Sequence, residues 1–143
     1  MIRHVSGIAE IVDDVDAAAQ FYREVLGLTV DHQPGGGYSV VKVPGVLHFG
    51  LWSRAAAAEA TFGDKTAVDR IPLGFAVEFE VDSVGPAAET IGERGWQIAQ
   101  APKTEPWGQA SSRFFLPSGM LGGITETPWA RRLSQEQQAE GET

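Results

Sequence analysis

The chain contains no cysteine, no long apolar run and no excess of positive charge. Without cysteine, disulfides, zinc–thiolate sites and thiol nucleophiles are excluded. No stretch of about 18 apolar residues occurs, so we expect no membrane-spanning helix. The 11 Lys and Arg against 19 Asp and Glu give a net charge of -8 without any basic stripe, so we expect no nucleic-acid partner. No signal-peptide pattern opens the chain, and we expect a cytoplasmic location.

The composition is that of a folded domain. Hydrophobic residues make up 43% and charged residues 21% of 143 residues, which is typical of a soluble globular protein. We expect a single domain over residues 1–130. The residues from 131 to 143 are polar enough to form a C-terminal tail.

A repeated motif divides this domain into two halves. Val12-Asp13-Asp14-Val15, followed by Ala18-Ala19, recurs as Val81-Asp82-Ser83-Val84, followed by Ala87-Ala88. Each copy follows a strand-like alternation of apolar residues and precedes apolar residues at helical spacing. Asp14 and Ser83 are the expected N-caps of these two helices.

Three shorter strands are predicted after each helix, separated by turns that contain Gly or Pro. The predicted strands cover residues 5–12, 28–32, 38–43 and 46–52, and then 75–81, 96–100, 110–115 and 120–127. The chain is therefore predicted as an α+β fold of two tandem βαβββ modules, about residues 1–54 and 71–130. A linker over residues 55–70 joins them, with a short helix or ordered segment over 55–60.

The motifs resemble those of the vicinal oxygen chelate superfamily, which includes glyoxalase I, bleomycin-resistance proteins and extradiol dioxygenases. The matching segments are residues 12–16, 21–28 and 79–84, Pro106-Trp107-Gly108 and residues 114–119. The resemblance implies a cupped, mixed, mostly antiparallel eight-stranded sheet, usually in a homodimer. It also implies that the enzymes of the family hold a divalent metal on four His, Gln or Glu side chains, from the first and last strand of each module.

The four positions that the resemblance assigns to metal ligands carry no donor side chain in this sequence. They fall on Gly7, Gly50, Ala76 and Gly123. Neither glycine nor alanine coordinates a cation through its side chain, and glycine in these places enlarges the hollow. We therefore expect no metal and no other cofactor, as in the metal-less, bleomycin-resistance-like branch of the superfamily.

A displaced site for one divalent metal is the alternative. Strand alternation places His48 and Glu78 on the same face as the vacated positions. Glu10 and Glu126 would complete a set of one His and three carboxylates. The same alternation turns these two residues away from the cup unless a bulge intervenes.

The residues predicted to contact a ligand combine aromatic, aliphatic and charged side chains. They are Ile11, His48, Trp52, Glu78, Trp107, Arg113, Phe115 and Leu121. Such a lining suits a flat, partly polar molecule, and the acidic balance favours a cationic one. The first hypothesis is a metal-independent binding protein that sequesters an antibiotic or another aromatic or cationic natural product.

Two enzymatic hypotheses accompany the binding hypothesis. In one, His48 or Glu78 acts as a general base in a metal-free isomerisation or cyclisation. In the other, the displaced metal site supports a lyase or a dioxygenase. The sequence leaves open whether the protein is an enzyme, and a small-molecule ligand is expected in each case.

Overall fold

The computed structural model describes residues 1–129, so the predicted tail over residues 131–143 lies outside the described residues. The first module comprises β1 (Ile2–Val12), α1 (Val15–Gln20), β2 (Thr29–Asp31), β3 (Tyr38–Lys42) and β4 (Phe49–Ser53). The second comprises β5 (Gly74–Val81), α3 (Val84–Glu93), β6 (Ile98–Thr104), β7 (Ala110–Phe115) and β8 (Leu121–Glu126). The segment between them contains α2 (Arg54–Phe62) and a short 3-10 turn (Val68–Arg70). The predicted fold class is confirmed.

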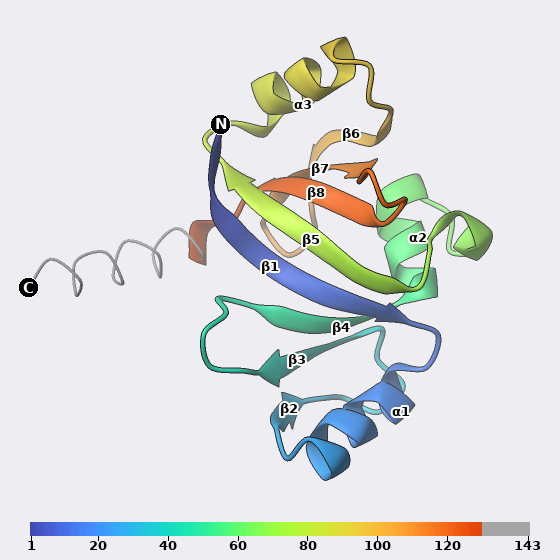
Figure 1. Ribbon diagram of the computed structural model, residues 1–143. Helices are drawn as coiled ribbons and strands as arrows, with labels where there is room; N and C mark the ends of the chain where they lie inside the picture. The colour runs from blue at the N-terminus through green and yellow to red at the C-terminus, as the bar shows by residue number, and fades with distance from the viewer. Residues whose placement is uncertain (130–143) are drawn as a thin grey trace, which may run out of the picture.

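All eight strands form one sheet in the order β2-β3-β4-β1-β5-β8-β7-β6. The first strands of the two modules, β1 and β5, run antiparallel side by side at its centre (Figure 1). Each of them pairs in parallel with the last strand of its own module, β1 with β4 and β5 with β8. The other neighbouring pairs are antiparallel. The four central strands are therefore those that carry the four vacated ligand positions.

Helices α1 and α3 cover the two ends of one face of the sheet (Figure 1). Val15 and Ala19 of α1 pack with Leu51 of β4 in one buried apolar cluster. Val84 of α3 packs with Ile124 of β8 in another. Within residues 1–129, no helix has the length and apolar character needed to cross a membrane.

The two covering helices begin in different ways. The Asp14 carboxylate accepts a hydrogen bond of 3.0 Å from the Ala17 amide, as predicted for an N-cap. Ser83 also stands at the N-cap position of α3, but its side chain makes no capping bond. The Glu126 carboxylate instead accepts from the Val84 amide at 3.1 Å. The cap of α3 therefore comes from the end of β8.

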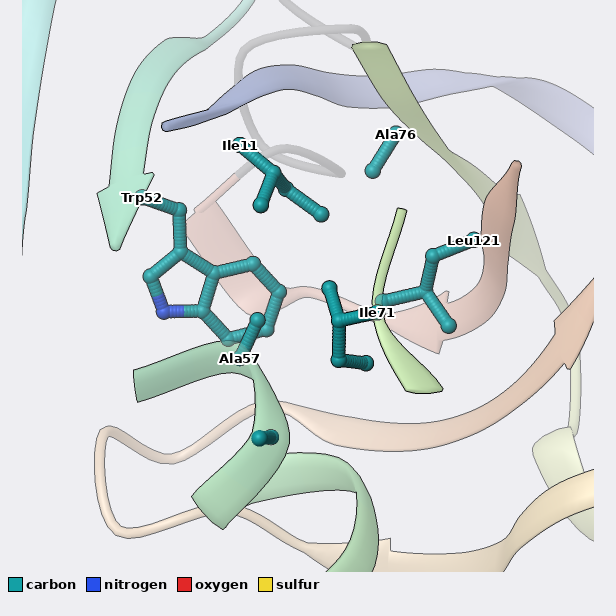
Figure 2. Packing of buried hydrophobic residues seen from close by; sticks show 7 residues of the cluster. Ile11, Trp52, Ala57, Ile71, Ala76 and Leu121 are labelled. Atoms are coloured by element: carbon teal, nitrogen blue, oxygen red, sulfur yellow. The ribbon is translucent and has the colours of Figure 1, made fainter. Parts of the chain in front are cut away.

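Helix α2 packs on the opposite face of the sheet, inside the cup. Its buried Ala57 belongs to a cluster with Ile11, Trp52, Ile71 and Leu121, from three strands and the segment after α2 (Figure 2). The side chains of Ile11 and Leu121 are each only 1% exposed. Of the two predictions for residues 55–60, a short helix or an ordered segment, the structure has the helix, and this helix packs inside the cup.

Candidate ligand pocket

A cavity of about 360 Å³ lies on the face of the sheet that carries α2. Its size falls within the range of small-molecule pockets, roughly 300–1,000 Å³. Both modules contribute to its walls, which are mainly apolar. Four aromatic side chains line it: Tyr38, Trp52, Trp107 and Trp129. The polar side chains among the lining residues come from both modules, and they are Ser6, Tyr38, His48, Glu78, Gln109, Arg113 and Thr127.

Most residues predicted to contact a ligand meet in this cavity. The structure brings together His48, Trp52, Glu78, Trp107 and Arg113. Ile11, Leu121 and Phe115 do not line it. Ile11 and Leu121 are buried in the cluster beneath α2, and Phe115 packs against the same cluster. Alternation along a strand identifies the face on which a residue lies, but not the helix that covers it.

Neighbouring side chains lie next to three of the four vacated positions. A Cβ atom added at Gly7 would lie 3.5 Å from Cβ of His48, and one at Gly123 would lie 3.5 Å from Cγ of Glu78. A Cβ atom added at Gly50 would collide with the hydroxyl of Tyr38 and lie 2.9 Å from Cε2 of the same ring. Tyr38 therefore fills the space that a side chain at position 50 would need, whereas His48 and Glu78 lie at ordinary contact distance from positions 7 and 123.

The residues present do not fit the divalent metal that the superfamily implies. The Glu10 carboxylate accepts a hydrogen bond of 2.5 Å from the Tyr22 hydroxyl, on the face covered by α1. Glu126 caps α3 on that same face. The displaced set of Glu10, His48, Glu78 and Glu126 is therefore not assembled. Among residues 1–129, no three His, Asp or Glu side chains lie close enough to hold a metal ion.

Tyr38 and His48 form a hydrogen-bonded pair on the wall of the first module. The Tyr38 hydroxyl contacts Nε2 of His48, and the two rings are nearly parallel, at 5° with centroids 5.8 Å apart. Burial lowers the pKa of His48. Burial, and to a lesser degree the charge of Glu78, raises the pKa of Tyr38. Both rings are therefore neutral near pH 7, and together they offer hydrogen bonds without charge.

Glu78 stands on the wall of the second module. Burial raises its pKa, while the nearby Arg113 guanidinium and the Gln109 amide oppose this rise. Nε2 of Gln109 donates to Oε2 of Glu78 at 3.3 Å and to the Thr127 hydroxyl at 2.6 Å. Oε1 of Gln109 accepts from the Trp107 indole at 3.0 Å. The Gln109 amide therefore holds the Glu78 carboxyl in place. Because its pKa is raised, Glu78 keeps its proton to a higher pH than an exposed glutamate does.

Arg113 lies beside Glu78 and is 2% exposed. Its Nη1 donates to Glu105 at 2.8 Å and also to Oε1 of Gln100. The Ser111 hydroxyl donates to the same Glu105 oxygen at 2.8 Å. The guanidinium carbon lies 5.2 Å from the ring centroid of Trp52, within reach of a cation–π interaction. Nη2 of Arg113 is buried and has no hydrogen-bond partner within residues 1–129.

The sequence did not single out several residues of this arrangement, namely Tyr38, Gln100, Glu105, Gln109, Ser111 and Thr127. Tyr38 reaches the cavity from β3, which is separated from β1 by β4. Glu105 follows β6, in a stretch that was not predicted as a strand, and Gln100 was expected only as the end of one. No local pattern marks a buried carboxylate in such a segment. Tyr38 could have been found by extending the alternation of β3 onto the face of Gly50, which pairs with Val40.

The structure thus consists of two βαβββ modules in one sheet, with one concave pocket between their walls. A family model described as Glyoxalase/Bleomycin resistance protein/Dioxygenase superfamily matches residues 4–121. The chain belongs to this superfamily.

Solved structures with the same fold carry names with different activities. A superfamily member from Vibrio splendidus 12B01 has a TM-score of 0.56 and 17% identity, and covers 89% of this chain and 100% of its own. Methylmalonyl-CoA epimerase from Mycobacterium tuberculosis has a TM-score of 0.60 and 16% identity, and the match covers 87% and 88%. A structure named NAD-dependent benzaldehyde dehydrogenase from Legionella pneumophila has a TM-score of 0.58 and 17% identity, covering 83% and 96%. No curated protein sequence matches the chain. At such low identities these likenesses show the fold alone.

Proposed function

We propose that this protein binds a small, flat, partly aromatic molecule in the pocket and that binding requires no metal. The observation that carries the proposal is the lining itself. The cavity of about 360 Å³ is lined by four aromatic side chains together with the polar side chains of His48, Glu78, Gln109 and Arg113. The aromatic side chains are Tyr38, Trp52, Trp107 and Trp129. Aromatic side chains stack on flat rings, and a few fixed polar groups then select their orientation.

The vacated positions support independence from metal. Tyr38 fills the space above Gly50, and His48 and Glu78 lie beside Gly7 and Gly123, so hydrogen-bonding side chains of the protein line this part of the cavity. A ligand that enters the cavity would meet these groups directly. On this basis we propose a role like that of the metal-less bleomycin-resistance branch, namely sequestration of an aromatic natural product such as an antibiotic.

The charges in the pocket sharpen the expected ligand. The sequence favoured a cation because of the overall acidity and Glu78. Burial raises the pKa of Glu78, so its negative charge is weakened where a ligand would meet it, and Arg113 stands next to it. These two facts favour a ligand selected for its aromatic ring over one selected for positive charge.

Tryptophan fluorescence tests this proposal, because three of the four tryptophans line the pocket. Trp96 is 49% exposed and lies in a separate surface groove, so the Trp96→Phe variant removes background emission without touching the pocket. We expect saturable quenching by members of a panel of aromatic antibiotics in the presence of EDTA. The quenching should persist in Trp96→Phe and decline in Trp107→Phe. Absence of any saturable response over a broad panel would contradict the proposal.

Glu78 favours a second candidate function, a metal-free acid–base enzyme. A buried carboxyl with a raised pKa, at the wall of a cavity, is suited to remove a proton from carbon next to a carbonyl group. The probe is 2-acetylnaphthalene in deuterated buffer, with proton NMR following exchange at its methyl group. Exchange faster than the buffer rate that disappears in Glu78→Gln, with binding retained, would support the enzyme. Exchange at the buffer rate would leave the binding role alone.

A further inference from the structure

The unpartnered nitrogen of Arg113 is the most unusual polar group of the pocket wall. A guanidinium carries five N–H donors, and burying a donor without a partner costs stability. Nη2 of Arg113 has no hydrogen-bond partner within residues 1–129, although the side chain lines the cavity and is 2% exposed. An acceptor atom supplied by a bound molecule would satisfy this donor.

Hydrogen bonds from Nη1 to buried residues hold the guanidinium in one orientation, so Nη2 cannot rotate toward another partner. Glu105 and Gln100 both accept hydrogen bonds from Nη1, and Ser111 holds the Glu105 carboxylate. These three residues are themselves buried. Turning Arg113 away would break an ion pair in which neither partner has access to water. Arg113 therefore presents Nη2 in a preset direction.

The surroundings define what the acceptor would be attached to. The guanidinium carbon of Arg113 lies 5.2 Å from the ring centroid of Trp52, and both side chains line the cavity, so the wall around Arg113 is aromatic and suits a flat ring. Glu105 already balances the charge of Arg113. Nη2 therefore lacks only a hydrogen-bond acceptor, and the oxygen of a neutral carbonyl or of a carboxylate can be that acceptor.

We propose that Arg113 selects ligands that carry a carbonyl or carboxylate oxygen on an aromatic ring, and that Glu105 acts as its positioning residue. This inference rests on the proposed function, since it assumes that the pocket binds aromatic molecules. It goes further by naming the substituent that the pocket recognises and the residue that recognises it.

Three naphthalene probes that differ in one substituent test the inference by isothermal titration calorimetry. They are 2-naphthoate, 2-acetylnaphthalene and 2-naphthylmethylammonium. A hydrogen bond from a charged donor corresponds to about tenfold or more in affinity. The wild-type protein should therefore bind the two oxygen-bearing probes at least about tenfold more tightly than the ammonium probe.

The double variant is chosen to keep the buried site neutral. Arg113→Met/Glu105→Gln removes both charges together, so that no carboxylate is left buried without its partner. This double variant should lose the preference while it keeps its affinity for the ammonium probe. Glu105→Gln alone should weaken the preference without abolishing it, because Arg113 remains but is less firmly held. Lys103→Gln is the matched control: Nζ of Lys103 lies 3.8 Å from Oε2 of Glu105 but is outside the pocket, and the preference should be unchanged.

The possible outcomes separate this inference from the proposed function. Equal affinities for all three probes in the wild-type protein would overturn the role of Arg113 and leave an aromatic-binding pocket intact. A preference that survives in a folded double variant would also overturn it. Failure of all three probes to bind would count against the pocket's proposed function, and the inference would fall with it.

Discussion

The two modules offer the same backbone to the pocket but different chemistry. In the first, Ala9 and Val40 lie opposite the vacated Gly50 on the neighbouring strands. In the second, Glu78 and Arg113 lie opposite the vacated Gly123. Ala9 and Val40 of the first module thus correspond to the acidic Glu78 and the basic Arg113 of the second.

This difference assigns separate tasks to the two walls. The first module fills its space with Tyr38 and His48, which are neutral and hydrogen-bond to each other. The second uses Glu78 and Arg113, which are held by further buried residues. A duplicated scaffold can therefore supply neutral contact from one side and oriented charge from the other.

The largest expected contrast is between the buried ion pair and the neutral pair. Arg113→Met leaves the Glu105 carboxylate buried without its partner, and should lower the free energy of unfolding by about 3–5 kcal/mol. Tyr38→Phe removes one hydrogen bond and should cost about 1 kcal/mol. Urea denaturation of both variants measures the difference. Losses of equal size would show that the two walls contribute alike.

The two vacated glycines should also respond differently. Gly50→Ala forces the Tyr38 ring, which is 40% exposed, to move away from its hydrogen bond with His48, and should cost about 1 kcal/mol or more. Gly123→Ala meets Glu78 only at ordinary contact distance, and should change stability by less than about 1 kcal/mol. Adding Tyr38→Ala should make the Gly50→Ala change nearly neutral. Thermal denaturation gives the comparison, and similar effects at the two glycines would contradict the placement of Tyr38.

The two walls should respond to pH in opposite directions. The pKa of Glu78 is raised in the fold from an ordinary 4.5, so its contribution is present below that value and is lost as pH rises through the folded pKa. The pKa of His48 is lowered from an ordinary 6.5, so its contribution is present above 6.5 and is lost as pH falls through the folded pKa. Unfolding free energies measured across pH should decline less on the alkaline side in Glu78→Gln and less on the acid side in His48→Gln. If both variants showed the same pH dependence of unfolding free energy as the wild-type protein, the burial of Glu78 and His48 would be contradicted.

The smallest expected effects concern the helix caps. Asp14→Ala removes a local cap and should destabilise α1 by about 1 kcal/mol. Ser83→Ala should cost only a few tenths, because its side chain makes no capping bond. Glu126→Ala should instead show the loss expected of a cap in the second module. A large effect of Ser83→Ala in thermal denaturation would contradict the observed capping.

Most of the fold could be predicted from the sequence because its signals are local or repeated. The copies of the motif beginning at Val12 and Val81 marked two strand–helix units, and the resemblance to the superfamily implied a cupped, mostly antiparallel eight-stranded sheet. Simple alternation also placed Glu10 and Glu126 on the face opposite His48. These inferences need only the period of a strand and the position of a motif.

The rest of the site depends on contacts between segments that are distant in the chain. Ile11 and Leu121 are buried because α2 crosses the cup and packs on them. A helical sequence pattern predicts the helix but not the surface on which it packs. The Arg113–Glu105 pair is buried because β6 and β7 fold back on each other with register shifts. Likewise, the cap from Glu126 reaches α3 across 42 positions of the chain. Periodicity describes neighbours along an element, and these partners are neighbours only after folding.

The central claim is that the pocket binds a flat aromatic molecule without metal. Calorimetric titration of 2-naphthoate into protein dialysed against EDTA, repeated after addition of Mn²⁺, Ni²⁺ or Zn²⁺, tests it most directly. The account predicts saturable binding of one molecule per chain, with the same Kd in all four conditions. Binding that appears only after a metal is added, or no saturable binding in any condition, would contradict it.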